Sequence, residues 1–122
     1  MERTITSEEA AAVRWLLEHA PVGDVMAYRA LPVEELRVYQ GCGCRCGCSS
    51  LNFQPDGWRA GAGIIADAWA EYTDGQQAGL ILWERDGEIA LLEVYDRHPG
   101  ASHRVPRVAN LRSFDEPAQG LP

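Results

Sequence analysis

Apolar residues near the start of the chain recur with a helical period. Between about residues 7 and 20 they are spaced three and four positions apart and comprise Val13, Leu16, Leu17 and Ala20. Thr6 and Glu9 have the spacing of a capping box before this helix, and Pro21 ends it. A shorter apolar stretch after Gly23-Asp24 predicts a second helix of two turns, which ends before Pro32.

Beyond residue 35 the pattern is that of short strands separated by turns. Residues 36–40 predict a strand that enters a cysteine-rich segment, and Pro55-Asp56-Gly57 predicts a turn after Phe53. Residues 64–73 fit a helix by their apolar spacing, and they fit a strand by the alternation of Ile65, Asp67, Trp69, Glu71 and Thr73. The Asp74-Gly75 turn that follows favours the strand.

Residues 80–85 and 88–95 give the clearest local prediction, a β-hairpin. They are joined by Asp86-Gly87, which is typical of a type I′ turn. A two-residue turn pairs Arg85 with Glu88, and by extension it pairs Trp83 with Ala90 and Ile81 with Leu92.

This register assigns the hairpin side chains to two faces. We expect one face to lie under the helices, and it carries Ile81, Trp83, Ala90, Leu92 and Val94. The other face is half apolar and carries Leu80, Leu82, Ile89, Leu91 and Tyr95 together with Glu84 and Glu93. Such a face requires a cover, either the C-terminal tail or a second subunit in a homodimer.

Together these patterns predict a single α+β domain over residues 1–122. Two N-terminal helices would pack on a mainly antiparallel sheet of about five strands. The last 25 residues contain four prolines and little periodicity, which predicts an irregular tail. We find neither an apolar stretch of transmembrane length nor a secretory leader, and we therefore expect a cytoplasmic protein.

All four cysteines of the chain lie in one short segment, at Cys42, Cys44, Cys46 and Cys48. A turn centred on Arg45 would place Cys42 opposite Cys48 and gather the four thiols on one face of a hairpin. These thiols are small side chains that pack easily under a sheet, so burial without further chemistry is the first interpretation.

Metal binding and thiol redox chemistry are the alternatives for this segment. Zinc sites usually leave two or more residues between paired cysteines, whereas this segment leaves one. Crowded thiolates suit copper(I) better, although nothing else in the chain indicates copper handling. A Cys42–Cys48 disulfide fits the distance between opposed strand residues but is unusual in the cytosol. Arg45 would lower the pKa of the neighbouring thiols and raise their reactivity.

Charge excludes several functions. The chain has eighteen acidic and eleven basic residues, and thus a net charge of −7. This charge argues against nucleic acid or an anionic membrane as partner. All the basic residues are arginine, so Schiff-base chemistry and a Walker-A lysine are absent, and the codon bias that this implies suggests a bacterial source.

Three further sets of residues are candidates for chemistry. His98 and His103 flank a Pro-Gly turn and would complete a mixed metal site with the cysteines. Glu84 and Glu93 would share a sheet face as a carboxylate pair for acid–base work. Ser49 and Ser50 follow the cysteines without the G-x-S-x-G frame of a hydrolase, which argues against a nucleophile there.

The order of motifs resembles a group of short uncharacterised bacterial proteins. The resemblance rests on Leu31-Pro32, the stretch Cys44-Arg45-Cys46-Gly47-Cys48-Ser49-Ser50-Leu51, the strand Leu91–Tyr95, and Val105-Pro106. It extends from about residue 9 to residue 111. Ser49 stands where the group often has proline, and Cys42 is an additional thiol. The resemblance implies an α+β domain of unknown role and brings no activity or catalytic residue.

Two functions are compatible with these observations. The first is a non-enzymatic interaction or accessory module that uses the outer sheet face or the cysteine turn as its contact surface. The second is a zinc- or copper-binding or thiol-redox protein that uses Cys42, Cys44, Cys46 and Cys48. We favour the first because no acid–base or nucleophile constellation is complete.

Overall fold

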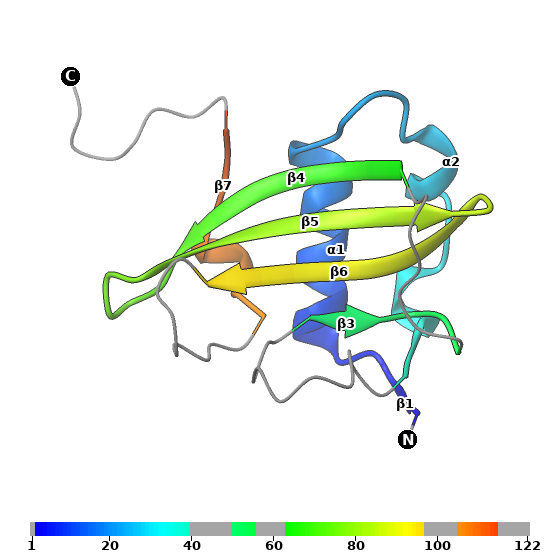
Figure 1. The fold of residues 1–122 in the computed structure, drawn as a ribbon, viewed down its shortest axis with the longest axis horizontal. Helices are drawn as coiled ribbons and strands as arrows, with labels where there is room; N and C mark the ends of the chain where they lie inside the picture. Colours follow the sequence, from blue (N-terminus) through cyan, green and yellow to red (C-terminus); the bar gives the residue numbers. More distant parts are fainter. Residues whose placement is uncertain (1, 40–49, 56–62, 97–104, 115–122) are drawn as a thin grey trace.

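The computed structural model describes residues 2–39, 50–55, 63–96 and 105–114. Helical elements of this part are α1 (Ser7–His19), α2 (Met26–Arg29) and the 3₁₀ turns η1 (Val33–Glu35) and η2 (Val108–Asn110). Its strands are β1 (Arg3–Thr4), β2 (Arg37–Val38), β3 (Leu51–Asn52), β4 (Gly63–Glu71), β5 (Gln77–Arg85), β6 (Glu88–Asp96) and β7 (Leu111–Ser113). The prediction of an α+β fold is confirmed (Figure 1).

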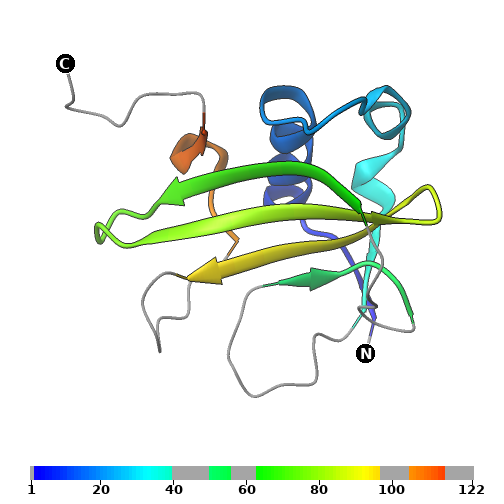
Figure 2. The same cartoon turned by 45° about the horizontal axis from the view of Figure 1, so that its top comes forward.

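An antiparallel sheet of five strands dominates the fold, in the order β3-β6-β5-β4-β7 (Figure 2). β1 and β2 form a separate two-stranded sheet. The ambiguous residues 64–73 are mostly strand, since β4 covers Gly63–Glu71, and this confirms the choice made from the turn that follows. The predicted tail contributes β7, which pairs with β4 and makes residues 111–113 an edge strand rather than irregular chain.

α1 forms where the sequence predicted it, and its first turn explains why. The Thr6 hydroxyl accepts a hydrogen bond from the Glu9 backbone N–H at 3.2 Å, and the Glu9 carboxylate accepts one from the Thr6 N–H at 2.9 Å. This reciprocal capping box satisfies two backbone donors that the helix itself leaves unpaired. Arg3 also donates to both oxygens of Glu9, at 2.8 Å each, and so ties β1 to the helix start.

The second helix is shorter than predicted. α2 has four residues and none of its side chains is buried, whereas the apolar spacing predicted two turns. Val25, just before it, is buried, and Tyr28 and Leu31 are partly buried against the core. Those apolar side chains therefore reach the core from a loop with a single helical turn.

The β5–β6 hairpin has the predicted turn but a different register. Asp86 and Gly87 both have positive φ, 55° and 79°, as a type I′ turn requires. Arg85 pairs with Glu88 and Glu84 with Ile89, but the following step pairs Trp83 with Leu91, so Ala90 is an extra residue in β6. A β-bulge of this kind moves every later pair by one residue.

This bulge corrects the predicted faces of β5. Leu82 pairs with Leu92 and Leu80 with Val94, and all four are buried. Leu80 and Leu82, expected on the outer face, therefore lie in the core, and Ile81 and Trp83, expected in the core, lie on the outer face. A shift of one residue exchanges faces because side chains alternate along a strand. Ile89 is also buried rather than outward-facing.

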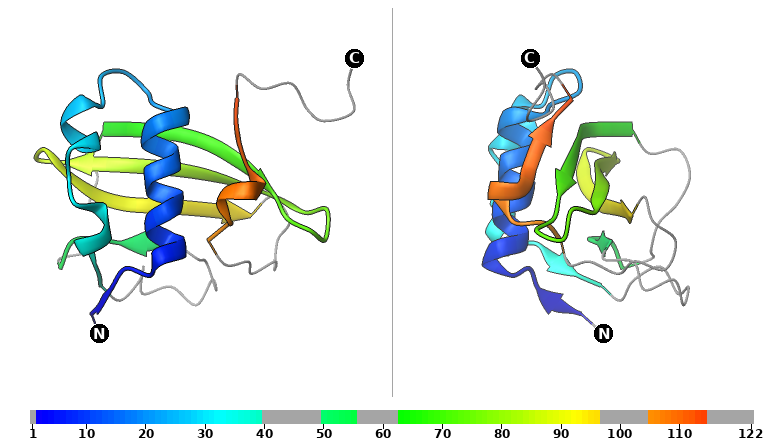
Figure 3. Two further views of the ribbon diagram at one scale, coloured as in Figure 1. Left: turned by 180° about the vertical axis from the view of Figure 1, so that it is seen from behind. Right: turned by 90° about the vertical axis from the view of Figure 1, so that its left-hand side faces the viewer.

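α1 lies across one face of the sheet, which we call the inner face (Figure 3). One core cluster joins the apolar side of α1 to the inner face, where β4 contributes three fully buried alanines and β5 and β6 contribute larger aliphatic residues. These inner-face residues are Ala66, Ala68, Ala70, Ala78, Leu80, Leu82, Leu92 and Val94. Within the described residues, no helix is both long and apolar enough to cross a membrane.

Candidate functional site: the outer sheet face and the base of the cysteine segment

The four predicted metal ligands, Cys42, Cys44, Cys46 and Cys48, lie outside the described residues, and so does Arg45. His98 and His103 lie outside them as well. Among the residues that the structure does describe, no group of three or more His, Cys, Asp or Glu side chains is placed to hold a metal ion. The structure therefore describes only the residues that flank the predicted thiol site on either side.

Those flanking residues are hydrogen-bonded neighbours. The Tyr39 N–H donates to the Asn52 carbonyl at 2.8 Å, and the two residues form an antiparallel bridge. The chain therefore reverses its direction between residues 39 and 52, as a hairpin requires. A regular ladder centred on Arg45 would pair Tyr39 with Leu51, whereas the observed partner is Asn52, one residue further on.

Ser50 anchors the far end of the segment to β6. Its hydroxyl accepts a hydrogen bond from the Val94 N–H at 2.9 Å and also lies 3.4 Å from the Val94 carbonyl, to which it donates. The side chain thereby replaces the backbone groups that a strand residue would offer at this position. Both hydrogen bonds join the Ser50 side chain to the backbone of β6, so Ser50 anchors this end of the segment.

The buried Asn52 fixes the chain that follows. Its side-chain amide donates to the Gln54 carbonyl at 2.8 Å, and its side-chain oxygen accepts from the Gln54 N–H at 3.1 Å. The Phe53 N–H donates to the Ala90 carbonyl at 2.9 Å. Residues 50–54 are therefore held rigidly to β6 by both backbone and side chains.

The predicted carboxylate pair is wrong, because Glu84 and Glu93 are on opposite faces of the sheet. The Tyr28 hydroxyl donates to Glu84 at 3.3 Å on the inner side, where burial and the Glu84 charge raise the pKa of Tyr28. Glu93 is on the other face, where its Oε1 accepts a hydrogen bond from the Trp83 indole at 3.1 Å. The bulge at Ala90 separates the two carboxylates, since it changes which β5 residues face outward.

The outer face, as we use the term, consists of the outward residues of β4, β5 and β6. They are Ile64, Asp67, Trp69, Glu71, Gln77, Gly79, Ile81, Trp83, Arg85, Glu88, Leu91, Glu93 and Tyr95. Nine of them form three transverse rows: Ile64–Trp83–Leu91, Asp67–Ile81–Glu93, and Trp69–Gly79–Tyr95. Apart from Gly79, every outer-face residue is partly or fully exposed, in contrast to the inner face.

Asp67 has an unusual environment in the middle row. Its Oδ1 atom is buried and accepts no hydrogen bond from any residue that the structure describes. Burial alone raises the pKa of Asp67, because the charged form loses solvation without gaining a donor. Its opposite neighbour in the row is Ile81, which has no polar group to offer.

Gly79 makes the third row possible. The Tyr95 ring occupies the place where a Cβ atom of Gly79 would lie, so any larger residue would collide with that ring. The ring therefore lies over β5 and towards Trp69 on the far side of the glycine. Trp69 in turn donates its indole N–H to the Ser113 carbonyl of β7 at 3.3 Å.

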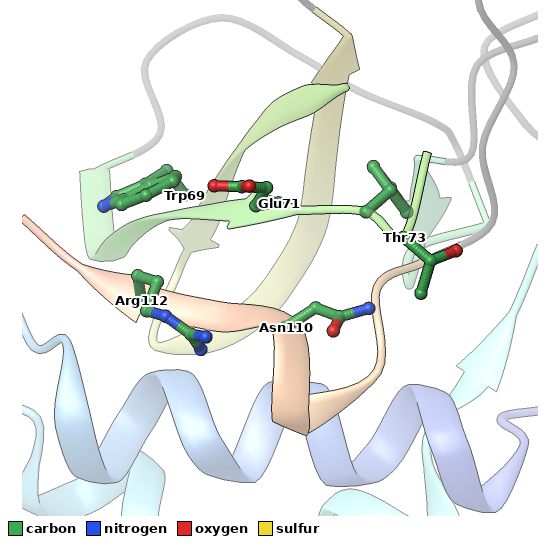
Figure 4. Close-up of a pocket in the computed structure, with 6 residues that line it drawn as sticks. Trp69, Glu71, Thr73, Asn110 and Arg112 are labelled. Carbon is green, nitrogen blue, oxygen red and sulfur yellow. The ribbon is translucent and has the colours of Figure 1, made fainter. Parts of the chain in front are cut away.

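A small cavity of about 130 Å³ opens beside Trp69, at the junction of β4 and β7 (Figure 4). Its other lining residues are Glu71, Tyr72, Thr73, Asn110 and Arg112. Arg112 donates to the carbonyls of Ala109 and Leu111, at 2.9 and 2.8 Å. A substrate pocket usually has a volume of ~300 Å³ or more, so this cavity is too small for one.

Sequence reasoning identified the outer face but assigned part of it wrongly. It placed Leu91, Glu93 and Tyr95 correctly, and the strand alternation of residues 64–73 put Asp67 and Trp69 on one face. It missed Ile81 and Trp83, because the bulge that turns them outward has no local signature.

Comparison with protein-family models, with curated proteins and with solved structures gave no match to this chain.

Proposed function

We propose that the protein is a non-enzymatic interaction module and that the outer face binds a partner protein. The observation that carries this proposal is the row structure of that face. Aromatic and aliphatic side chains lie next to one another on three adjacent strands, and they remain partly exposed. Trp and Tyr in such clusters are typical of the energetically dominant residues of protein interfaces.

The arrangement of helices supports the choice of this face. In the views of Figure 3, α1 and α2 are on the inner side of the sheet, and no helix of the described part lies on the other side. The candidates for catalysis among the described residues have other roles: Glu84 accepts a hydrogen bond from Tyr28, and Ser50 is bound to Val94. These roles support a binding function rather than an enzymatic one.

A photo-crosslinking experiment tests the proposal. A photoreactive phenylalanine analogue at Ile81, in the middle of the outer face, should give a discrete covalent adduct in extracts of the source cells. The same analogue at the exposed Glu18 of α1 is the matched control and should give none. The adduct should disappear when an excess of the unmodified protein competes. Adducts at both positions, or at neither, contradict the proposal.

Metal or thiol chemistry at Cys42, Cys44, Cys46 and Cys48 is the second candidate function. The specific observation in its favour is the Tyr39–Asn52 bridge, because it brings the two ends of the cysteine segment together. We propose zinc or copper(I) as the metal in that case. Elemental analysis of protein purified without added metal, with a count of reactive thiols, tests it: stoichiometric metal and blocked thiols support this candidate, whereas four reactive thiols and no metal contradict it.

A further inference from the structure

The middle row of the outer face combines two carboxylates with indole and aliphatic surface. Asp67 and Glu93 flank Ile81, with their Cα atoms about 10 Å apart because two strand spacings separate them. Trp83 is on the same face of β5 as Ile81, two residues along the strand. The apolar side chain of Ile81 therefore lies between the two acidic residues, with the Trp83 indole in the next row.

Among the residues that the structure describes, neither carboxylate has a cationic partner. Glu93 accepts one hydrogen bond, from the neutral Trp83 indole, and Asp67 Oδ1 has no hydrogen-bond partner. Two described arginines lie on this side of the sheet: Arg112 is bonded to two backbone carbonyls beside Trp69, and Arg85, at the end of β5, is paired with Asp86. No ion pair joins either of them to Asp67 or Glu93 within the described part of the chain.

We infer that the outer face recognises an arginine side chain in a basic segment of the partner, held between Asp67 and Glu93 and against Trp83. This inference rests on the proposed function and names the chemistry of the partner. A guanidinium group matches the site in three ways: its planar fork pairs with carboxylates, its face stacks on indole, and it gives up its hydration more easily than an ammonium group.

The charge of the whole chain favours the same partner. A net charge of −7 attracts a basic segment from a distance and repels acidic ones. The adjacent cavity beside Trp69 already contains a charge of each sign, because both Glu71 and Arg112 line it. The middle row, in contrast, contains two carboxylates and no basic residue.

Binding of a fluorescent peptide of alternating arginine and glycine to the full-length protein tests the inference. The same peptide with citrulline in place of arginine is the uncharged control. We expect measurable affinity for the arginine peptide and none for the citrulline peptide. The double variant Asp67→Asn/Glu93→Gln should bind about tenfold more weakly, which corresponds to ~1.4 kcal/mol. Trp83→Leu should weaken binding about threefold through the lost stacking.

A charge-matched control separates the site from general acidity. Glu18→Gln/Glu35→Gln removes the same two charges from exposed positions outside the outer face and should change the affinity less than about twofold at physiological salt. Circular dichroism confirms that each variant is folded. Equal weakening in both double variants, or no binding of the arginine peptide, overturns the inference. A homodimer that buries the outer face also overturns it, since the occupant would then be a second copy.

These outcomes are distinct from those that test the proposed function. A specific crosslink from Ile81 together with no affinity for arginine would leave the interaction module standing and reject only the chemistry of its partner. Loss of the crosslink at every position would reject the module itself.

Discussion

The inner and outer faces of the large sheet belong to the same strands but differ in how their side chains are satisfied. On the inner face, alanines of β4 and aliphatic residues of β5 and β6 are buried with α1, and the one charged residue of β5 on this side, Glu84, accepts a hydrogen bond from Tyr28. On the outer face, indoles and carboxylates alternate with aliphatic residues, and one carboxylate oxygen has no partner. Within the described residues, the inner face is therefore buried and its charged residue is paired, whereas the outer face keeps accessible apolar surface and an unpartnered carboxylate oxygen.

The largest expected difference in stability between the two faces is tested at Leu82. Leu82→Ala leaves a cavity in the fully buried layer between β5 and α1 and should lower the free energy of unfolding by about 3 kcal/mol. Ile81→Ala, one residue away on the outer face, should cost less than about 1.5 kcal/mol because Ile81 is already partly exposed. Urea unfolding of both variants measures the difference. Equal losses would show that the outer face is as well packed as the inner one.

Gly79 offers a test of the third row. Gly79→Ala forces the Tyr95 ring away from β5 and should destabilise the protein by about 1–3 kcal/mol, as overpacking does. Combining it with Tyr95→Ala removes the collision, so the double variant should be more stable than the sum of the single effects predicts. Thermal unfolding of the four proteins in this cycle gives the coupling, and strict additivity would contradict the described position of the ring.

Ser50→Ala tests the anchor at the base of the cysteine segment. The variant leaves the Val94 N–H without an acceptor and should cost about 1 kcal/mol. Amide hydrogen exchange should show faster exchange at Val94 in particular. Ser7→Ala, at the first residue of α1, is the control for loss of a serine hydroxyl and should leave Val94 exchange unchanged.

The smallest effect is expected at Asp67 and depends on pH. Because the pKa of Asp67 is raised by burial, its ionisation opposes folding, and this penalty is absent at low pH and grows as the pH rises through the unfolded and then the folded pKa. Asp67→Asn should therefore be more stable than the parent at neutral pH, by up to about 1 kcal/mol, and equal to it in acid. Chemical denaturation at a series of pH values measures this, and a constant difference across pH would contradict it.

What could be predicted from the sequence was whatever depends on neighbours along the chain. The capping box of α1 and the Asp86-Gly87 turn follow from a few adjacent residues, and both are confirmed. The strand identity of residues 64–71 was predicted from alternation and the turn that follows, and it places Asp67 and Trp69 correctly. These features need no knowledge of distant parts of the chain.

Features that depend on tertiary packing could not be predicted from the sequence. The bulge at Ala90 exchanges the two faces of β5, and it brings Leu80 and Leu82 under α1 without leaving a trace in the local pattern. β7 has three residues and is a strand because it adds to the edge of β4. The side-chain anchor at Ser50 depends on Val94, which lies 44 positions further along the chain.

The Tyr39–Asn52 bridge joins the two ends of the cysteine segment through main-chain atoms, and Ser50 ties the second end to β6. These contacts use residues outside the segment, so we expect them to form whatever sequence is inserted between them. Doubling the length of the loop between these two residues would raise the free-energy cost of closing it by only about 0.6 kcal/mol. We therefore expect the rest of the fold to be retained when a segment of different length or sequence replaces the one between Tyr39 and Asn52.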